Sequence, residues 1–392
     1  MPWRTLTAMS QRMEFVILAK QSGLAFSEVC RRFGVSRKTG YKWLERYKAG
    51  GTDALQDRSR KPRRSPKQVS RAVAEAVIAL RVETAWGGRK LRRRLQDLGH
   101  QDVPAASTCT EILRRAELLK RDVPAGPMQR FERALPNELW QMDHKGDFAT
   151  QSGQRCHPLT VLDDHSRFNL VLDAAGNQRT PTVQAALTEA FTRYGLPEAI
   201  LCDNGGAWGN VADGTGHTAL TVWLLRLGVR VLHGRPYHPQ TQGKEERFHR
   251  TLQDELLGRH TWRDLSHCAA GFARYRQRYN HERPHFSLGG DTPVTRYRPS
   301  VRAMPAHLPV LEYSAMEVRV VRAKGVITFR NHTWAIGQAF ASLPIGLRPS
   351  PQADGQWEVY FSFFKLGILD LTSLTSAKHT VHRLSSLRPP KD

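Results

Sequence analysis

The chain has 392 residues, long enough for two to four domains with a sizeable core. Its formal net charge of +23 indicates a polyphosphate partner, above all nucleic acid. No run of about 18 apolar residues is present, so we expect no membrane partner. The opening MPWRTLTAMS lacks the features of a secretory signal. The five cysteines are widely spaced, which argues against a disulfide framework or zinc ribbon and favours a cytoplasmic protein.

The positive charge is concentrated in the first third of the chain. Residues 1–133 hold 29 Lys and Arg against 13 Asp and Glu. A basic head followed by a more balanced body predicts a binding module ahead of a working domain.

The first part of the head, residues 1–55, is predicted to be an all-α helix-turn-helix domain. Within it, FSEVCRRFGVSRKTGYKWLERYKAG (26–50) contains two helical segments joined by a short turn. We expect Ser27 and Ser36 to cap the two helices, and Gly34 to end the first in a left-handed conformation. This is helix-turn-helix spacing.

The second of these helices begins with Arg37 and Lys38, which are candidate DNA contacts. Polar and basic residues at this position are typical of a recognition helix that meets base edges. The alternative is an ordinary helical hairpin whose charged face is solvated. The net charge and the spacing favour DNA binding.

A second helical unit follows a basic linker. The linker, QDRSRKPRRSPK (56–67), is too rich in Pro, Ser and Arg to bury a core. Residues 68–122 then show helical patterns, with Ser107 as the expected cap of a later helix. We predict a second helix-turn-helix here, so that the two modules together would read a long DNA site.

From residue 134 the pattern changes to strands alternating with helices. This order predicts a mixed sheet with helices on its faces. The strands are expected in 139–149, 155–176, 199–209 and 229–235, and the helices in 180–197 and 218–228.

Three carboxylates in this region are candidate metal ligands. Asp143 lies within the first strand, where a carboxylate is costly unless something binds it. Asp203 follows another strand, at the end where ligand sites of α/β sheets gather. Glu246 lies in the first turn of a helix that begins near Lys244, in HPQTQGKEERFHRTLQDEL.

The apolar stripe of that helix is expected to pack on the sheet through Phe248, Leu252 and Leu256. Glu246 lies about 200° around the helix from Phe248, so it should face away from the stripe. Three converging carboxylates would suit two hard divalent ions that activate a water or hydroxyl. The alternative is that Glu245 and Glu246 are salt-bridge partners on a solvated face.

Other acidic residues of the region are expected to be structural. Asp147, Asp163 and Asp164 lie on strands or turns.

The C-terminal part is predicted to be all-β. Residues 316–373 alternate short strands with turns, which favours a small β-barrel. Residues 374–392 form a basic tail.

Four motifs in order, WQMDHKGDF, LCDNGGAW, RPYHPQTQGKEERFHRTL and YNHERPHFSLGGDTPVTRY, resemble the Asp-Asp-Glu transposases of bacterial insertion sequences. The resemblance implies a ribonuclease-H-like, retroviral-integrase-type core over 134–300. It also implies that Asp143, Asp203 and Glu246 bind two Mg²⁺ ions, with Mn²⁺ as a possible substitute. Glu245 lies where the family pattern varies, so catalysis is assigned to Glu246.

The resemblance further implies that the protein binds the element's terminal repeats, nicks the 3′ strands and joins them to target DNA. Such a protein would act as a homo-oligomer, a dimer or larger, on double-stranded DNA in the bacterial cytoplasm, in association with the nucleoid. The expected DNA contacts beside the site are His238, Gln240, Lys244 and Arg247.

Two departures from the family pattern are evident. Forty-two residues separate Asp203 from Glu246, more than is usual, and GNVADGTGHT (209–218) is expected to be the extra loop. The head also lacks the His and Cys module of retroviral integrases, so no zinc is expected.

Two rival functions remain open at this stage. One is a non-catalytic DNA-binding regulator descended from a transposase, which would need none of the acidic residues. The other is a metal-dependent nuclease that cuts without joining.

Overall fold

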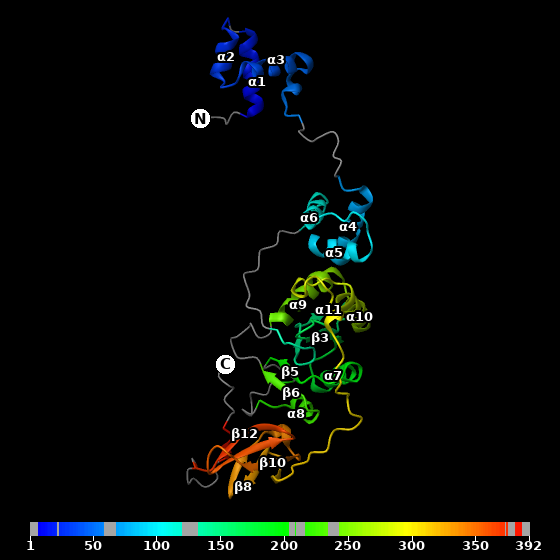
Figure 1. The fold of residues 1–392 in the computed structure, drawn as a ribbon, viewed down its shortest axis with the longest axis vertical. Coiled ribbons are helices and arrows are strands. Elements are labelled where there is room, and N and C mark those ends of the chain that lie inside the picture. The colour runs from blue at the N-terminus through cyan, green and yellow to red at the C-terminus, as the bar shows by residue number, and fades with distance from the viewer. Residues whose placement is uncertain are drawn as a thin grey trace. The chain divides into compact units, whose positions relative to one another are not determined.

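The structure is a computed structural model (Figure 1). It describes residues 7–21, 23–58, 68–119, 132–203, 208, 216–233, 243–372, 374 and 381–385. The chain divides into two compact units, Met1–Gln68 and Val69–Asp392. No helix in the described ranges is long and apolar enough to cross a membrane.

The first unit is a bundle of three helices followed by a 3₁₀ turn. The elements are α1 (Ala8–Gln21), α2 (Phe26–Arg32), α3 (Arg37–Gly50) and η1 (Thr52–Leu55). Their buried core contains Phe15, Val16, Val29, Cys30, Trp43 and Leu55. The helices approach closely at Gly40, where a Cβ atom would lie 2.7 Å from Cys30 Sγ.

The predicted turn between α2 and α3 is confirmed, with one error in the capping. Gly34 has φ +63°, and the Ser36 side chain accepts a hydrogen bond from the Thr39 backbone N–H at 3.2 Å. Ser27, however, does not cap α2, because the helix begins one residue earlier and Ala25 is at the N-cap.

The second unit opens with three helices, α4 (Arg71–Thr84), α5 (Gly88–Asp97) and α6 (Ala106–Arg115). They enclose a core of Val77, Trp86, Leu91, Leu95, Cys109 and Leu113. Gly88 lets α5 approach α6, since a Cβ there would lie 2.5 Å from the Ala106 carbonyl oxygen. Ser107 is not a cap, because α6 begins at Ala106 and has Ala105 at its N-cap.

The central sheet is mixed, as predicted. Its strands are β1 (Trp140–His144), β2 (Phe148–Ala149), β3 (Arg155–Asp163), β4 (Asn169–Ala175), β5 (Ala199–Cys202) and β6 (Arg230–His233). The order is β2-β3-β1-β5-β6, with β4 also paired to β3. β1 pairs antiparallel with β3, whereas β5 runs parallel to both β1 and β6.

Helices cover both faces of this sheet. They are α7 (Thr180–Tyr194), α8 (Ala219–Arg226), α9 (Gly243–Glu255) and α10 (Leu265–His281), followed by the short α11 (Pro293–Arg296). Trp140 and Met142 of β1 pack in one core with α7 and α8. The opposite face packs on α9 and α10, where Phe248, Leu252 and Leu256 form the predicted stripe. Strand alternation therefore turns Gln141 and Asp143 toward the α9 side.

The predicted C-terminal barrel is not confirmed. The strands are β7 (Glu317–Val320), β8 (Val326–Phe329), β9 (His332–Ala335), β10 (Pro344–Pro349), β11 (Gln356–Phe361), β12 (Phe364–Asp370) and β13 (Val381–Arg383). They form two open sheets, β12-β11-β10-β7 and β13-β9-β8. β7 and β8 belong to different sheets, so the strands do not close into a ring. The two sheets share one apolar core, which also includes Val222 and Leu225 of α8.

The close approach at Gly40 generates a stability prediction. Gly40→Ala should destabilise the first unit by about 1–3 kcal/mol, because the added methyl group meets Cys30, Phe15 and Phe26 within 3 Å. That strain should exceed the gain in helix propensity of about 1 kcal/mol. The loss of stability is measured by hydrogen exchange of α1–α3 in the full chain. Gly23→Ala, where nothing lies within 4 Å, is the control. Equal protection in both variants would contradict the prediction.

Candidate active site

Asp143 is held in the sheet by strands on either side of it. It is opposite Thr160 of β3 in the antiparallel register, and β5 flanks β1 on the other edge. Its side chain is 24% exposed, and its Oδ1 accepts the His144 backbone N–H at 2.7 Å. A carboxylate is thus fixed on the α9 face and remains partly accessible.

Asp203 directly follows β5, as the sequence predicts. Because β1 and β5 are parallel, with Gln141 opposite Leu201, both acidic residues lie toward the same ends of neighbouring strands. The Trp208 indole N–H donates to Asp203 Oδ1. The buried Trp208 ring in turn stacks on His144, with centroids 5.2 Å apart. The Trp208 ring, stacked on His144, therefore lies beside the Asp203 carboxylate.

The two glutamates in the first turn of α9 differ completely in their exposure to solvent. Glu245 is fully buried, whereas Glu246 is exposed. One residue is about 100° of helix rotation, which accounts for the difference. Glu246 is therefore the glutamate that can reach a ligand from solvent, and Glu245 is not on a solvated face.

Electrostatics shows that the three acidic groups influence one another. Burial, together with the charges of Asp203 and Glu246, raises the pKa of Asp143 to about 6. Carboxylates that repel each other in this way favour a bound cation. Within the described ranges, though, no group of three or more His, Cys, Asp or Glu is arranged to hold a metal ion.

Glu245 belongs to a buried polar cluster beneath Asp143. The Thr160 Oγ1 atom lies 3.0 Å from Glu245 Oε2, 2.8 Å from His249 Nε2 and 2.9 Å from the Asp143 carbonyl oxygen. Burial raises the pKa of Glu245 well above its usual value and lowers that of His249 to about 4. Burial therefore favours the uncharged form of both groups, and both lie within hydrogen-bonding distance of the hydroxyl. The sequence pattern gave no signal for this cluster.

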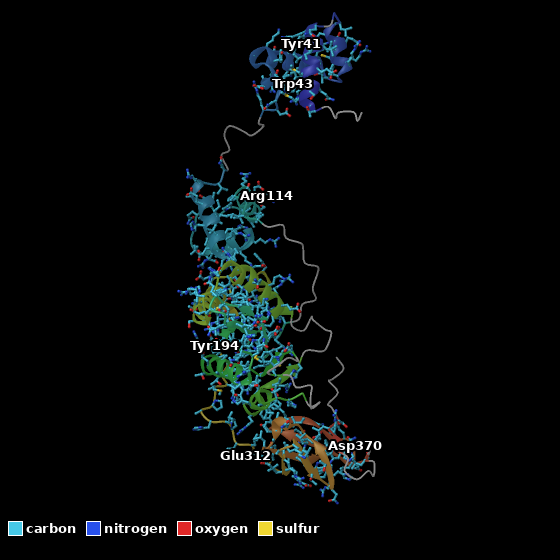
Figure 2. All side chains as sticks on the ribbon, turned by 180° about the vertical axis from the view of Figure 1, so that it is seen from behind. Tyr41, Trp43, Arg114, Tyr194, Glu312 and Asp370 are labelled. Carbon is cyan, nitrogen blue, oxygen red and sulfur yellow. The ribbon has the colours of Figure 1, made fainter. Side chains whose placement is uncertain are left out.

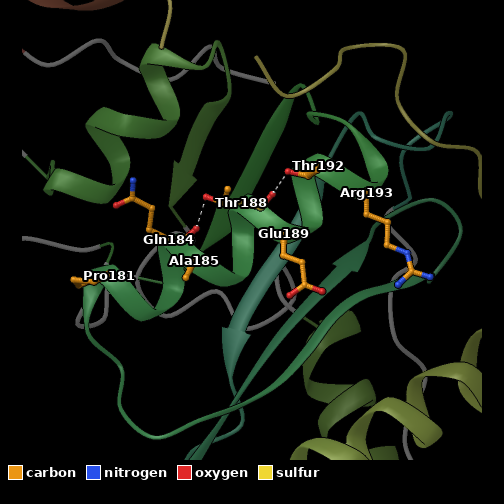
Figure 3. A pocket seen from close by; sticks show the side chains of 7 residues that line it. All are labelled: Pro181, Gln184, Ala185, Thr188, Glu189, Thr192 and Arg193. Carbon is orange, nitrogen blue, oxygen red and sulfur yellow. Dashed lines mark hydrogen bonds between the residues drawn. The ribbon is translucent and has the colours of Figure 1, made fainter. Parts of the chain in front are cut away.

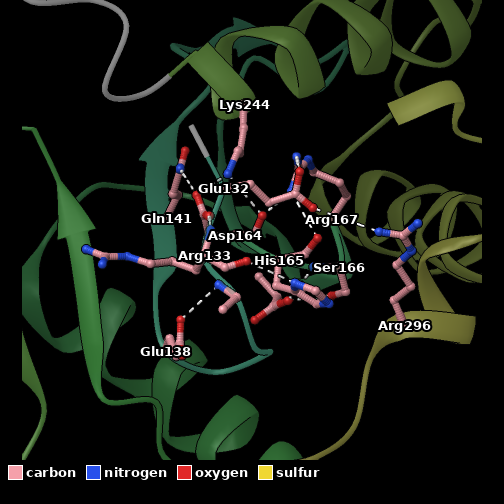
Figure 4. A network of polar contacts seen from close by, with 12 residues as sticks. Glu132, Arg133, Glu138, Gln141, Asp164, His165, Ser166, Arg167, Lys244 and Arg296 are labelled. Atoms are coloured by element: carbon pink, nitrogen blue, oxygen red, sulfur yellow. Dashed lines mark hydrogen bonds and ion pairs between the residues drawn. The ribbon is translucent and has the colours of Figure 1, made fainter. Parts of the chain in front are cut away.

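Lys244 makes an internal ion pair. Its Nζ lies 2.5 Å from Asp164 Oδ1, and its side chain is only 15% exposed (Figure 4). Burial lowers the pKa of Lys244 to about 8, so the ammonium is mostly charged at neutral pH. We therefore leave Lys244 out of the proposed DNA contacts. The structural roles expected for Asp163 and Asp164 agree with their complete burial in hydrogen-bonded positions.

The other expected DNA contacts divide into two groups. Arg37 and Lys38 are exposed in the first turn of α3, and Arg247 is exposed on α9. His238 and Gln240 lie outside the described residues, as does most of the loop 209–218. Near Arg37 and Lys38, Tyr41 is 54% exposed and stacks on Phe26, which adds a ring to the same face of α3 (Figure 2).

The second helical unit is docked on the core through α5. Lys90 Nζ lies 3.5 Å from Glu255 of α9, Arg94 Nη2 lies 2.5 Å from Glu282, and Arg93 Nη2 lies 3.4 Å from Asp291. Three basic side chains of α5 thus pair with acidic residues of the core. Sequence reasoning missed this docking, since it joins residues 165 to 198 positions apart.

Glu255 is the centre of that contact. Arg283 binds it with Nε 3.0 Å from both carboxylate oxygens, and the Tyr275 hydroxyl donates to it at 3.3 Å. Burial alone would raise the pKa of Glu255, but the charges of Arg283 and Lys90 outweigh burial and lower it. The carboxylate is therefore charged, paired and buried at the C-terminal end of α9.

A separate surface hollow of about 700 Å³ lies on α7 (Figure 3). Its lining residues are Pro181, Gln184, Ala185, Thr188, Glu189, Thr192 and Arg193. None of them belongs to β1, β5 or α9, so this hollow is not part of the carboxylate site. All five cysteines are free and buried, in agreement with the expected absence of disulfides.

Five family models match parts of the chain. An integrase core domain model matches residues 133–239, and a second one matches 227–293. A helix-turn-helix domain model matches 11–63, and a homeodomain-like domain model matches 39–113. The model of the IS481 family transposase C-terminal domain matches 316–377.

Similar curated proteins include two from insertion elements. The insertion element IS476 uncharacterized 39.2 kDa protein of Xanthomonas euvesicatoria is 28% identical over 229 residues, covering 56% of this chain and 64% of the relative. The insertion element IS407 uncharacterized 31.7 kDa protein of Burkholderia multivorans is 31% identical over 164 residues, covering 41% and 56%. The chain thus spans less than two thirds of either relative.

Among solved structures, a simian T-cell lymphotropic virus intasome in complex with PP2A regulatory subunit B56 gamma is 16% identical. The match covers 74% of this chain and 97% of the matched chain of that structure, with a TM-score of 0.36. The assignment therefore rests on the family models and the insertion-element relatives. These agree with the resemblance seen in the motifs: the chain contains regions that match integrase core domains and an IS481 family transposase C-terminal domain, and it is similar to insertion-element proteins.

Proposed function

We propose that this protein is a transposase that binds the terminal repeats of an insertion sequence, nicks their 3′ ends and joins them to target DNA. The observation that carries the proposal is the placement of Asp143, Asp203 and Glu246. They come from β1, the end of β5 and the first turn of α9, within the two regions that match integrase core domain models. The charges of the other two help to raise the pKa of Asp143, so the three groups act on one region.

The donor set fits divalent cations of the Mg²⁺ type. Carboxylate oxygens are the ligands that hard cations prefer, and a bound cation would relieve the repulsion that raises the pKa of Asp143. Asp143, Asp203 and Glu246 would hold the metal, with Mn²⁺ as a substitute for Mg²⁺. When bound, two such ions would lower the pKa of the attacking water or hydroxyl and stabilise the leaving oxygen.

The surrounding residues support this chemistry in distinct ways. Trp208 donates to Asp203 and so orients that carboxylate. The Thr160 cluster supports the backbone of Asp143 through its carbonyl oxygen. Burial favours the uncharged forms of Glu245 and His249, which limits the charge that the cluster adds beneath the site. Exposed Arg247 lies beside Glu246, where a phosphate backbone would approach.

DNA recognition is assigned to the helical units and assembly to the DNA-bound state. Arg37 and Lys38 lie exposed at the start of α3, inside the region that matches a helix-turn-helix domain. Because two element ends must be processed together, we infer a homo-oligomer on double-stranded DNA. The bacterial insertion-element relatives favour action on DNA in the bacterial cytoplasm.

The carboxylate variants test the proposed chemistry. Asp143→Asn, Asp203→Asn and Glu246→Gln should each strongly reduce nicking and joining in Mg²⁺. The loss should exceed the roughly 10–100-fold effect of removing a residue that only supports a metal ligand. Each keeps the shape of the side chain and removes a charge that a cation needs. The measurement is cleavage and joining of a labelled duplex carrying the element's end, with a supercoiled target.

Glu245→Gln is the matched control. Glu245 is buried, and burial favours its uncharged form, which the amide resembles, so most of the nicking rate should remain. Loss in Glu245→Gln with full activity in Glu246→Gln would show that the other glutamate is catalytic. Nicking without joining in the parent protein would indicate a nuclease, and binding without either reaction would indicate a regulator.

The salt dependence of end binding tests the DNA surface. Neutralising six to ten phosphates should cost the full chain about 10³–10⁵ in affinity between 50 and 200 mM salt. If Lys38 contacts a phosphate, Lys38→Ala should reduce the slope of log Kd against log salt by about one. Fluorescence anisotropy with an end duplex and a scrambled duplex measures both quantities. A flat salt response would exclude the basic surface as the binding surface.

A further inference from the structure

Asp164 is a fully buried carboxylate that receives three donors from three separate segments. Lys244 Nζ of α9 lies 2.5 Å from its Oδ1, and Gln141 Nε2 of β1 donates to the same oxygen at 2.6 Å. The Arg133 backbone N–H, in the segment leading to β1, donates to Oδ2 at 2.8 Å (Figure 4). One carboxylate thus connects the strand and the helix that carry Asp143 and Glu246.

The spacing along the chain makes this connection specific to the site. Gln141 is two residues before Asp143 on β1, and Lys244 is two residues before Glu246 on α9. In a strand, residues two apart point to the same face, so the side chains of Gln141 and Asp143 both face α9. Lys244 lies in the same first helical turn as Glu246, so its anchor also restrains the start of that turn.

We propose that Asp164 is a positioning residue that sets the separation between Asp143 and Glu246, an inference that rests on the proposed function. Lys244 is its partner on α9, and Gln141 is its partner on β1. The ion pair is more than a surface contact, because Asp164 is completely buried and Lys244 is 15% exposed. Removing one partner of such a pair leaves a buried charge uncompensated, so the geometry depends on both.

The turn that carries Asp164 is itself rigid. Asp163 accepts the backbone N–H groups of Asn137 and Ser166, each at 2.7 Å. The Asp164 carbonyl oxygen accepts a hydrogen bond from the Arg167 guanidinium and another from Lys244 Nζ at 3.1 Å. The backbone on both sides of the Asp164 carboxylate is therefore held by hydrogen bonds, one of which comes from Lys244 of α9.

Direct metal binding and nicking test the proposal. Lys244→Met keeps the apolar stem and removes the charge, so Mn²⁺ alone should bind the full chain about tenfold more weakly, as for loss of an outer-sphere partner. The measurement is the free-ion signal of Mn²⁺ in electron paramagnetic resonance, without DNA. The Mg²⁺ concentration for half-maximal nicking should rise in parallel, while affinity for the end duplex stays unchanged.

Two further variants separate positioning from general stability. Asp164→Asn should show the same weakened metal binding, and the double variant with Lys244→Met should be no weaker than the worse single variant. Lys365→Met breaks a comparably buried ion pair, Lys365 with Glu358 at 2.6 Å, in the C-terminal sheets. It is the matched control, and it should leave metal binding and Mg²⁺ dependence at parental values.

The outcomes that would overturn the proposal are distinct from failure of the proposed function. Parental Mn²⁺ affinity in Lys244→Met would overturn it. The proposal would also be overturned if Lys244→Met bound the end duplex more weakly, with a smaller slope of log Kd against log salt and an unchanged Mg²⁺ dependence of nicking. That result would make Lys244 a DNA contact. If Asp143→Asn binds Mn²⁺ and nicks like the parent, the metal site itself is elsewhere, and it is the proposed function that fails.

Discussion

Helix α9 is held at both ends by buried ion pairs, and the arrangement of the core depends on that restraint. At its start Lys244 pairs with Asp164, and at its end Glu255 pairs with Arg283. Between these anchors the apolar stripe packs on the sheet and on α10. The helix can therefore neither slide nor rotate without exposing a charge, and Glu246 is fixed relative to the strands that carry the other two acidic residues.

This arrangement explains how a strongly basic chain keeps several carboxylates inside. A buried carboxylate is costly unless it is paired or neutralised, and the structure uses both solutions. Asp164 and Glu255 are charged and paired with cations, whereas Glu245 has a raised pKa and lies beside Thr160 and His249. In the proposed site Asp143 is neither fully paired nor fully neutral. That difference distinguishes a carboxylate available to a ligand from those that hold the fold together.

The sequence predicted those parts of the molecule that depend on local patterns. The strand before Asp203, the left-handed Gly34 and the stripe on α9 follow from spacing and residue type. The burial of Glu245 and the pairing of Lys244 could not be predicted, because both depend on which strand faces the first turn of α9. The predicted C-terminal barrel was not confirmed for a related reason, since alternating strands do not specify how strands from separate hairpins pair. Likewise, nothing local marks α5 as a docking helix.

The docking of α5 has a consequence for the position at which bound DNA would be cut. Lys90, Arg93 and Arg94 of the second helical unit pair with acidic residues of the core. If this unit binds DNA, as the proposed function requires, these pairs would set the distance and rotation at which the bound duplex meets the core. Moving the gripped sequence by about five base pairs, half a turn of the duplex, would present the wrong side of the backbone to the carboxylates. The place of the cut along the DNA would then be a property of the folded chain itself.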